Sequence, residues 1–137
     1  MRYRFSTNSK IKLNSCHFDL QVIINEALAY GIMDISVIEG HRNKEKQDRY
    51  FSLGQSKVKW PNSKHNKTQS DAVDVAPFVN GKISWNRLHC CVLAGIILAS
   101  AERQGAKIRW GGNWDMDGEP ITDQAFQDLV HFERVKK

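Results

Sequence analysis

The sequence lacks an apolar run long enough to cross a membrane. Its longest such run, from Cys90 to Ala99, is about half of the roughly 20 residues that a spanning helix needs. No apolar segment follows the basic residues near the N-terminus, so the sequence predicts no signal peptide. We therefore expect accumulation in the cytoplasm of the producing cell and no stable membrane insertion.

Cysteine is scarce, with Cys16, Cys90 and Cys91 as the whole set. An odd number with an adjacent pair excludes a disulfide framework, and no C-x-x-C spacing indicates a thiolate metal site. The three thiols are predicted to be reduced, small apolar side chains.

Lysine and arginine are absent between Trp110 and Glu133, although the chain of 137 residues has a formal net charge of +5. Residues 1–70 carry 12 basic against 6 acidic side chains, and residues 71–137 carry 8 against 9. The basic half indicates an anionic partner such as nucleic acid, a membrane surface or a cell-wall polymer, with an ordinary solvated surface as the alternative. No basic stripe is interleaved with aromatic residues, which argues against nucleic acid.

Hydrophobic periodicity predicts three helices. The first has an apolar face from Leu20 to Leu28 and a stop at Gly31, and the second runs from a cap at Asn43 to Leu53. The third begins at a Ser84 cap and ends near Gly105. Its expected apolar face consists of Leu88, Cys91, Val92, Ile96 and Ala99.

Short apolar runs predict strands between and after these helices. They cover Ile35–Ile38, Ala72–Ala76 (closed by Pro77), Lys107–Trp110 and Val130–Val135, with a hairpin turn at Asn80-Gly81. We find no repeat or linker. The chain is therefore expected to form one domain over residues 1–137, of the α+β class, with helices packed on a small, largely antiparallel sheet.

Three residues far apart in the chain form a candidate metal site. Asp74 lies inside an apolar strand, where an unpaired buried carboxylate would cost several kcal/mol, so it requires a cation or hydrogen-bond donors. His65 and His131 supply the nitrogen ligands that zinc prefers. Taken singly, either histidine could be an ordinary surface residue.

Two carboxylates accompany the second histidine. Glu133 shares the strand face of His131 and can orient a ligand histidine by a hydrogen bond. Asp128 lies three residues earlier, within reach of a reacting water without being a ligand. By spacing alone this combination is only moderately specific for a metal site.

Several motifs resemble the phage L-alanyl-D-glutamate peptidases, endolysins of the zinc peptidase group that includes the D-alanyl-D-alanine carboxypeptidases. The S-x-H…[GS]-x-A-x-D box resembles Ser63-Lys64-His65 … Ser70-Asp71-Ala72-Val73-Asp74, and the closing D/E-x-x-H-x-E box resembles Asp128-Leu129-Val130-His131-Phe132-Glu133. Gly40-His41-Arg42 … Gln47 and the segment Trp110–Asp115 also match the family pattern.

The resemblance implies roles for these residues. His65, Asp74 and His131 would bind zinc, Asp128 would be the general base, and Arg42 would stabilise the oxyanion. Ser63 and Gln47 would support the site together with Glu133, while simple structural roles for Arg42, Gln47 and Ser63 stay open. The loop between His65 and Asp74 is longer than in many relatives, by residues 66–69, which leaves its substrate contacts open.

The segment from Asn113 to Gly118 is a candidate calcium loop. Asn113, Asp115 and Asp117 match ligand positions 1, 3 and 5 of an EF-hand loop, but Gln124 stands where a bidentate Glu is expected. A turn closed by hydrogen-bonded Asx side chains is the alternative.

The expected function is that of a zinc-dependent peptidoglycan endopeptidase that cuts the L-Ala–D-Glu bond for host lysis, reaching the wall through a separate membrane pore. The partner is bacterial peptidoglycan, and a monomer is expected. Alternatives are a D-alanyl-D-alanine carboxypeptidase and a non-catalytic, metal-containing wall-binding module.

Overall fold

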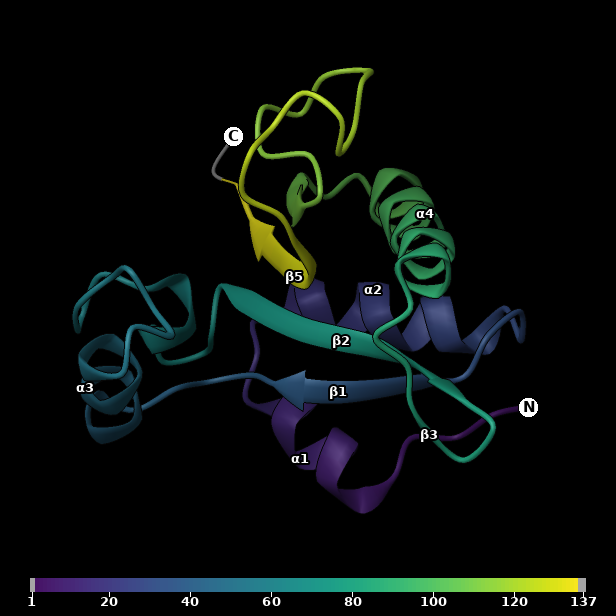
Figure 1. Cartoon of the computed structure of the whole chain (residues 1–137). Helices are drawn as coiled ribbons and strands as arrows, with labels where there is room; N and C mark the ends of the chain where they lie inside the picture. Colours follow the sequence, from purple (N-terminus) through teal and green to yellow (C-terminus); the bar gives the residue numbers. More distant parts are fainter. Residues whose placement is uncertain (1, 136–137) are drawn as a thin grey trace.

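An antiparallel sheet organises the chain in the computed structural model, which describes residues 2–135 (Figure 1). Four strands lie in the order β1-β2-β5-β4, and a short β3 pairs with β2. Their bounds are β1 Ile35–Glu39, β2 Ala72–Val79, β3 Lys82–Ile83, β4 Ile108–Gly111 and β5 Asp128–Arg134. The predicted α+β class and antiparallel sheet are confirmed.

Four α-helices and one 3₁₀ helix accompany the sheet: α1 Thr7–Asn14, α2 Phe18–Ala29, α3 Lys44–Ser52, η1 Lys64–Asn66 and α4 Arg87–Gln104. Helix α2 buries the predicted face and packs against α4, where Ser100 Oγ donates a hydrogen bond to Ile23 O over 3.1 Å. The core joins these helices to the strands through residues such as Val37, Val75 and Phe132. None of the helices within residues 2–135 has the length and apolarity to span a bilayer.

The prediction for α4 was wrong in its cap and in its buried face. Asn86, rather than Ser84, caps the helix, because its side-chain oxygen accepts hydrogen bonds from the Leu88 and His89 amides. Leu88 and Val92 are exposed, at 76% and 51%. The buried face comprises Cys90, Leu93, Ala94, Ile97, Ser100 and Ala101. Both sides of α4 carry apolar residues, so periodicity alone could not choose between them.

Three further elements differ from the predictions. Helix α1 was not predicted, because its sequence TNSKIKLN is mostly polar and buries only Ser9 and Leu13. Strand β2 continues past Pro77 to Val79, since the Pro77 carbonyl accepts from Ser84 N and the Phe78 amide donates to Asp34 O. The final strand begins at Asp128, two residues earlier than expected.

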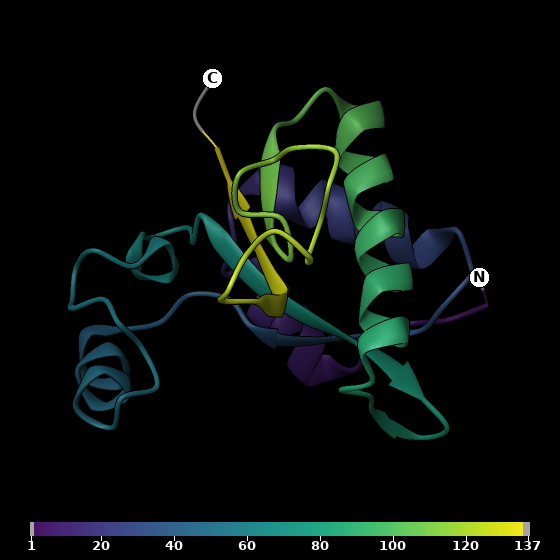
Figure 2. The ribbon, with the colours of Figure 1, turned by 45° about the horizontal axis from the view of Figure 1, so that its top comes forward.

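Residues 43–67 form a separate projection, here called the α3 lobe. It contains α3, the following loop and η1, and it extends away from the sheet between β1 and β2 (Figures 1 and 2). The chain returns from this lobe at Ser70, whose amide donates to Ser15 O. A cleft lies between the α3 lobe and β5, and residues of both line it.

Candidate metal centre and cleft

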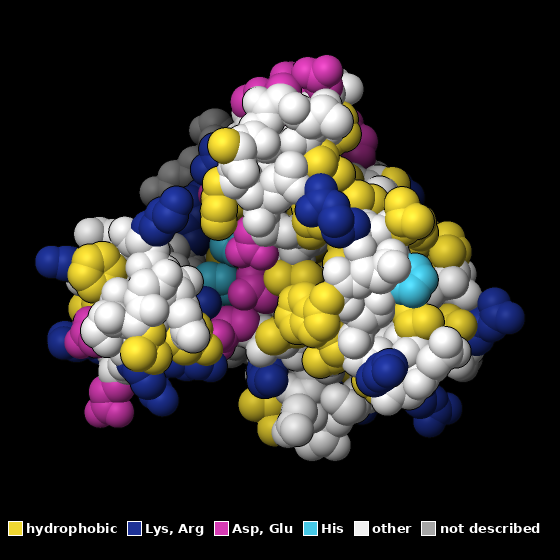
Figure 3. Space-filling view, in the orientation of Figure 1, with side chains coloured by type: hydrophobic (Ala, Val, Ile, Leu, Met, Phe, Trp, Pro, Cys, Tyr) yellow, Lys and Arg dark blue, Asp and Glu magenta, His cyan; other side chains and the backbone are white. Residues whose placement is uncertain are grey.

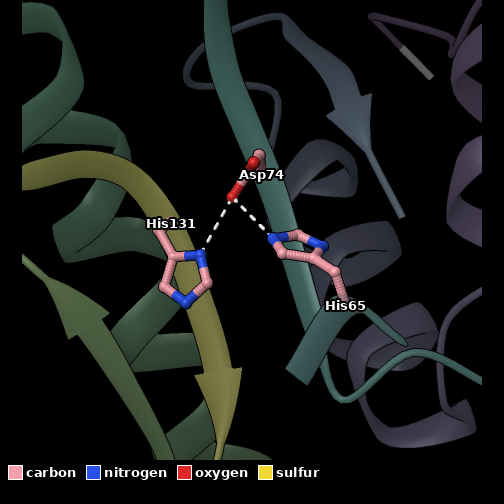
Figure 4. A group of neighbouring side chains, drawn as sticks. All are labelled: His65, Asp74 and His131. Atoms are coloured by element: carbon pink, nitrogen blue, oxygen red, sulfur yellow. Dashed lines mark hydrogen bonds and ion pairs between the residues drawn. The ribbon is translucent and has the colours of Figure 1, made fainter. Parts of the chain in front are cut away.

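The register of three strands places acidic and histidine side chains in one row. Asp74 on β2 is paired with His131 on β5, and Glu39 at the end of β1 is paired with Asp74 on the other side. His65 reaches the same point from η1, so two adjacent strands and the α3 lobe each contribute one side chain (Figure 4).

The three predicted ligands converge on one point. Asp74 Oδ1 lies 3.3 Å from His65 Nε2 and 3.1 Å from His131 Nδ1. One ligand atom from each of the three side chains lies within 4.8 Å of the others. The side chains are 3%, 15% and 12% exposed for His65, Asp74 and His131. A single ion could therefore contact all three while one side of the group faces the cleft.

The remaining hydrogen bonds of the histidines define which nitrogen carries a proton. His65 Nδ1 lies 2.8 Å from the carbonyl oxygen of Gly40, and His131 Nε2 lies 2.9 Å from Glu133 Oε1. Both partners can only accept, so these two nitrogens donate. In the neutral rings, His65 Nε2 and His131 Nδ1 then direct lone pairs toward the Asp74 carboxylate. The two lone pairs and the carboxylate repel one another, and only a proton or a metal cation between them can remove this repulsion.

The pKa values of Asp74 and His131 without a metal also indicate that this group of side chains is stabilised by a positive charge. Burial opposes ionisation of Asp74, but its hydrogen bonds with His131 and His65 prevail and hold its pKa below the ordinary value. Burial also disfavours the charged form of His131, yet Asp74 and Glu133 raise its pKa to about 9. A divalent cation would satisfy these groups in place of the proton, so the donor set of two imidazoles and one carboxylate fits zinc.

Glu133 accepts a hydrogen bond from the ring nitrogen of His131 that faces away from Asp74, and it forms ion pairs with two basic side chains. Its Oε2 atom lies 2.7 Å from Arg109 and 3.2 Å from Lys64. Burial of Glu133 is outweighed by His131 and Arg109, which lower its pKa to about 2. The carboxylate therefore stays ionised at neutral pH, and it accepts the His131 hydrogen bond as predicted from the shared strand face.

Asp128 begins β5 and lines the same cleft. It is paired with Gly111 across a register shift, and a Cβ at Gly111 would lie 2.1 Å from the Asp128 carbonyl oxygen. Only glycine permits this approach of β4 to the start of β5. Burial, with a further contribution from the Asp74 charge, raises the pKa of Asp128 above its ordinary value.

Arg42 and Gln47 are buried and hydrogen-bonded to each other, and the half-buried Ser63 is joined to them through Asn66. Arg42 donates to Gln47 Oε1 over 3.0 Å, and its guanidinium carbon lies 4.6 Å from the Tyr50 ring centroid. Arg42 also pairs with Glu39 at 3.6 Å, a structural contact of the kind that the sequence left open. Ser63 Oγ accepts from the His65 amide and caps η1. Arg42 and Ser63 both line the cleft.

Gln47 is fully buried at 0% exposure. Besides Arg42, it contacts Asn66, which donates to Gln47 Oε1 over 3.2 Å and to Arg42 O over 3.0 Å. Asn66 was not singled out from the sequence. Its position directly after His65 was the available signal, and its amide joins the segment carrying Arg42 to the segment carrying His65.

The cleft has a volume of about 390 Å³, which suits a peptide-sized ligand. Acidic and histidine side chains are visible in the hollow between the α3 lobe and the rest of the molecule (Figure 3). Trp114 and Phe126 line the side opposite the lobe, their rings stacked at 6.0 Å, and the Trp114 ring lies 5.7 Å from His131. A place in the site was not predicted from the sequence for Lys57, Phe126 or the indole of Trp114.

A second concavity of about 470 Å³ lies between the end of α4 and β4. It is lined by residues such as Leu98, Gly105 and Met116, and the three clustered ligands are not among its lining residues. We therefore assign the chemistry to the smaller cleft.

The acidic loop that precedes β5 gathers its own carboxylates. Ligand atoms of Asp115, Asp117 and Asp123 lie within 4.8 Å of one another, and the hydrogen bond with Asp117 raises the pKa of Asp123 to about 6. Asp123 was not predicted from the sequence to belong to this cluster. Gln124 at the twelfth loop position is occupied by hydrogen bonds to Trp114 N and Gly111 O.

Comparisons with known proteins identify the family of this chain. The profile of the family described as phage L-alanyl-D-glutamate peptidase matches residues 1–135. The chain belongs to this family. One relative is the L-alanyl-D-glutamate peptidase of Escherichia phage T5. The two sequences are 31% identical over 120 residues, which cover 87% of this chain and 87% of the relative.

A solved structure extends the similarity to the fold. The L-Ala D-Glu endopeptidase ChiX of Serratia marcescens superposes with a TM-score of 0.79 at 29% sequence identity, covering 96% of this chain and 90% of that one. The resemblance inferred from the short motifs of the phage L-alanyl-D-glutamate peptidase family thus extends across nearly the whole chain.

Proposed function

We propose that the protein is a zinc-dependent peptidoglycan endopeptidase that hydrolyses the amide bond between L-Ala and D-Glu of the peptide stem. The observation that supports this most strongly is the convergence of His65, Asp74 and His131 at the floor of a cleft that also contains Asp128. The substrate is that named for the family and for its relatives.

His65 Nε2, Asp74 Oδ1 and His131 Nδ1 would hold the metal. Zinc, when bound, supplies a Lewis acid that polarises the scissile carbonyl and acidifies water. Gly40 O and Glu133 hold the two rings in the orientation that this requires.

Asp128 is proposed as the general base. It takes a proton from the attacking water and passes it to the leaving amine of D-Glu. The partial burial that raises its pKa brings its proton affinity closer to that needed for transfer at neutral pH. We further propose that Arg42, oriented by Gln47 and stacked on Tyr50, donates to the oxyanion that forms on the carbonyl. Ser63 supports His65 through η1.

The test is mass spectrometry of purified muropeptides digested by the zinc-loaded protein. Release of the stem peptide beginning at D-Glu is expected, and chelation should abolish it. Loss of a single terminal D-Ala would instead establish the carboxypeptidase alternative. An Asp128→Ala variant should bind zinc but lose activity by about 100-fold or more; unaltered wall lysis by this variant would favour the non-catalytic binding module.

The biological role proposed from the family is host lysis at the end of a phage infection, with passage to the wall through a separate membrane pore. Wild-type phage and a phage carrying Asp128→Ala should differ in the time of host lysis but not in the assembly of particles inside the cell. Equal lysis times would contradict this role.

Calcium is proposed as a second ion for the acidic loop. Asp115, Asp117 and Asp123 supply carboxylates, and Asn113 adds a buried side-chain oxygen that has no hydrogen-bond partner. Isothermal titration with calcium should show binding that Asp115→Asn and Asp117→Asn each weaken at least tenfold. No heat change in the zinc-loaded wild type would exclude the site.

A further inference from the structure

The cleft presents one cation, Lys57, that no acidic side chain within residues 2–135 neutralises. Asp74, Asp128 and Glu133 give its floor a negative character, and the basic residues there are largely committed to carboxylates. Arg42 pairs with Glu39, and Lys64 pairs with Glu133 at 3.2 Å while also donating to Arg134 O. Lys57 lines the same cleft but makes no hydrogen bond or ion pair with residues 2–135.

Lys57 is nevertheless held in place. Its ammonium nitrogen lies 4.9 Å from the centroid of the Phe126 ring, so it reaches from the α3 lobe to the opposite wall of the cleft. Phe126 stacks on Trp114, whose ring contacts His131. An aromatic face orients an ammonium group without removing its charge. The Lys57 ammonium group is therefore connected to His131, a proposed zinc ligand, through the stacked rings of Phe126 and Trp114.

The substrate carries a negative charge that suits this position. In the peptide stem, D-Glu continues the chain through its γ-carboxyl group, so its α-carboxylate is free on the carbon next to the scissile nitrogen. In the zinc-loaded cleft the metal would neutralise Asp74, and Glu133 is paired with Arg109 and Lys64. The repulsion that this carboxylate would face therefore comes mainly from Asp128. A cation beside the leaving-group half of the substrate would offset that repulsion and recognise the carboxylate.

We propose that Lys57 is a specificity-determining residue that pairs with the free α-carboxylate of D-Glu. This inference rests on the proposed function, because it requires the L-Ala–D-Glu bond to lie over the metal centre. It also predicts that stems in which this carboxylate is amidated, with D-isoglutamine in place of D-Glu, are poor substrates. An amide keeps the shape of the group but has no charge to pair with the ammonium.

Lys59 provides a matched control within the same lobe. It is also an exposed lysine above an aromatic ring, 5.0 Å from the Phe51 centroid, but it does not line the cleft. Lys57→Met and Lys59→Met remove the same charge and retain a similar apolar stem. A general effect of lobe charge would appear equally in both variants.

The experiment measures kcat and KM for two soluble muropeptides that differ only in a D-Glu α-carboxylate or α-amide, with zinc-loaded wild type, K57M, K57R and K59M. Wild type and K59M should prefer the carboxylate substrate by about 10- to 100-fold. K57M should lose most of that preference through a higher KM for the carboxylate substrate, with kcat little changed, because the carboxylate is present in the ground state. K57R should restore part of the preference.

The outcomes separate the two proposals. Equal cleavage of both substrates by wild type, or a wild-type preference that persists in K57M, would overturn the role of Lys57 and leave the endopeptidase intact. A loss of preference in K59M equal to that in K57M would likewise overturn it in favour of general lobe charge. Cleavage of neither substrate at this bond by wild type would overturn the proposed function and this inference together.

Discussion

At the scale of single residues, the site depends on which nitrogen of each histidine is already occupied. Gly40 O and Glu133 each accept one ring N–H, which leaves the other nitrogen of each ring directed at Asp74. Such outer partners commonly change metal affinity by 10- to 100-fold when they are removed. The two contacts are therefore as informative to test as the ligands themselves.

Replacing Glu133 with Gln should weaken zinc binding about tenfold or more, because the change retains the shape but removes the charge that polarises His131. Competition with a chromophoric zinc chelator measures the affinity. Glu102→Gln, at an exposed position of α4, is the control and should bind zinc like wild type. Equal affinity in all three proteins would contradict the assigned role of Glu133.

The thiol of Cys16 should be inert in the folded protein. Burial raises its pKa to about 12, so the reactive thiolate is scarce at pH 8, and the side chain is 0% exposed. Cys91 is only partly buried. Peptide mass spectrometry after brief iodoacetamide treatment at pH 8 should find Cys91 alkylated and Cys16 unmodified, with both modified in guanidinium. Equal modification in the native state would show that the core around Cys16 opens.

At the scale of elements, the site depends on close backbone approaches that glycine permits. A Cβ at Gly40 would lie 2.2 Å from Lys12 O in the last turn of α1 and 2.3 Å from Oγ of Ser15, the C-cap of that helix. The carbonyl of the same glycine accepts the hydrogen bond from His65. Helix α1 thus contributes to the metal centre although none of its side chains lies among the ligands.

Gly40→Ala should therefore destabilise the fold by about 1–3 kcal/mol and weaken zinc binding, since the backbone must move away from α1. Thermal unfolding with and without zinc measures both effects. Gly95→Ala is the matched control, because Gly95 is an exposed α4 residue with no atom within 4 Å of the added Cβ. That variant should keep its zinc affinity and gain up to about 1 kcal/mol of stability. A Gly40→Ala protein as stable as wild type would show that α1 does not constrain the site.

Sequence patterns predicted the elements whose two faces differ in polarity and failed where they do not. Helix α2 has one apolar face and was predicted correctly, whereas α4 is apolar on two sides and its core face was assigned wrongly. Helix α1 is held in part by the Ser9 hydroxyl, whose oxygen accepts a hydrogen bond from the Val37 amide on β1. Hydropathy does not register a polar contact of this kind.

The site was predictable to the extent that its residues lie within motifs. The two boxes indicated His65, Asp74 and His131, and the structure brings these together. Lys57 and Phe126 come from loops without a spacing signal, and their contact across the cleft exists only after folding. The strand register also places Asp74 opposite His131, and composition does not specify that alignment.

At the scale of the whole molecule, charge and catalysis are arranged around the same cleft. Residues 43–67 carry seven basic and two acidic side chains, so the α3 lobe alone accounts for a charge of +5, equal to the formal charge of the whole chain. The acidic loop of residues 112–127 has no lysine or arginine. The cleft thus has a basic wall on one side and an acidic loop on the other, and the lobe is the surface best suited to an anionic wall polymer.

Reversing two lobe charges should reduce adsorption to isolated sacculi. A Lys59→Glu/Lys67→Glu double variant should bind several-fold more weakly than wild type at low salt, and the difference should shrink at high salt as the charges are screened. Lys82→Glu/Lys107→Glu makes the same charge change outside the lobe and serves as the control. Sedimentation of protein with sacculi over a range of salt measures the effect; equal weakening by the two double variants would show that only net charge matters.

We propose that His65, Asp74 and His131 share one divalent ion on which hydrolysis depends. The most direct test is the zinc content per chain, by elemental mass spectrometry, of active wild type beside His131→Ala after both are dialysed against the same zinc buffer. We expect about one zinc per chain in wild type and a loss of most of it in the variant. Wild type that cleaves muropeptides while holding no divalent metal, or a His131→Ala protein that retains zinc as wild type does, would contradict it.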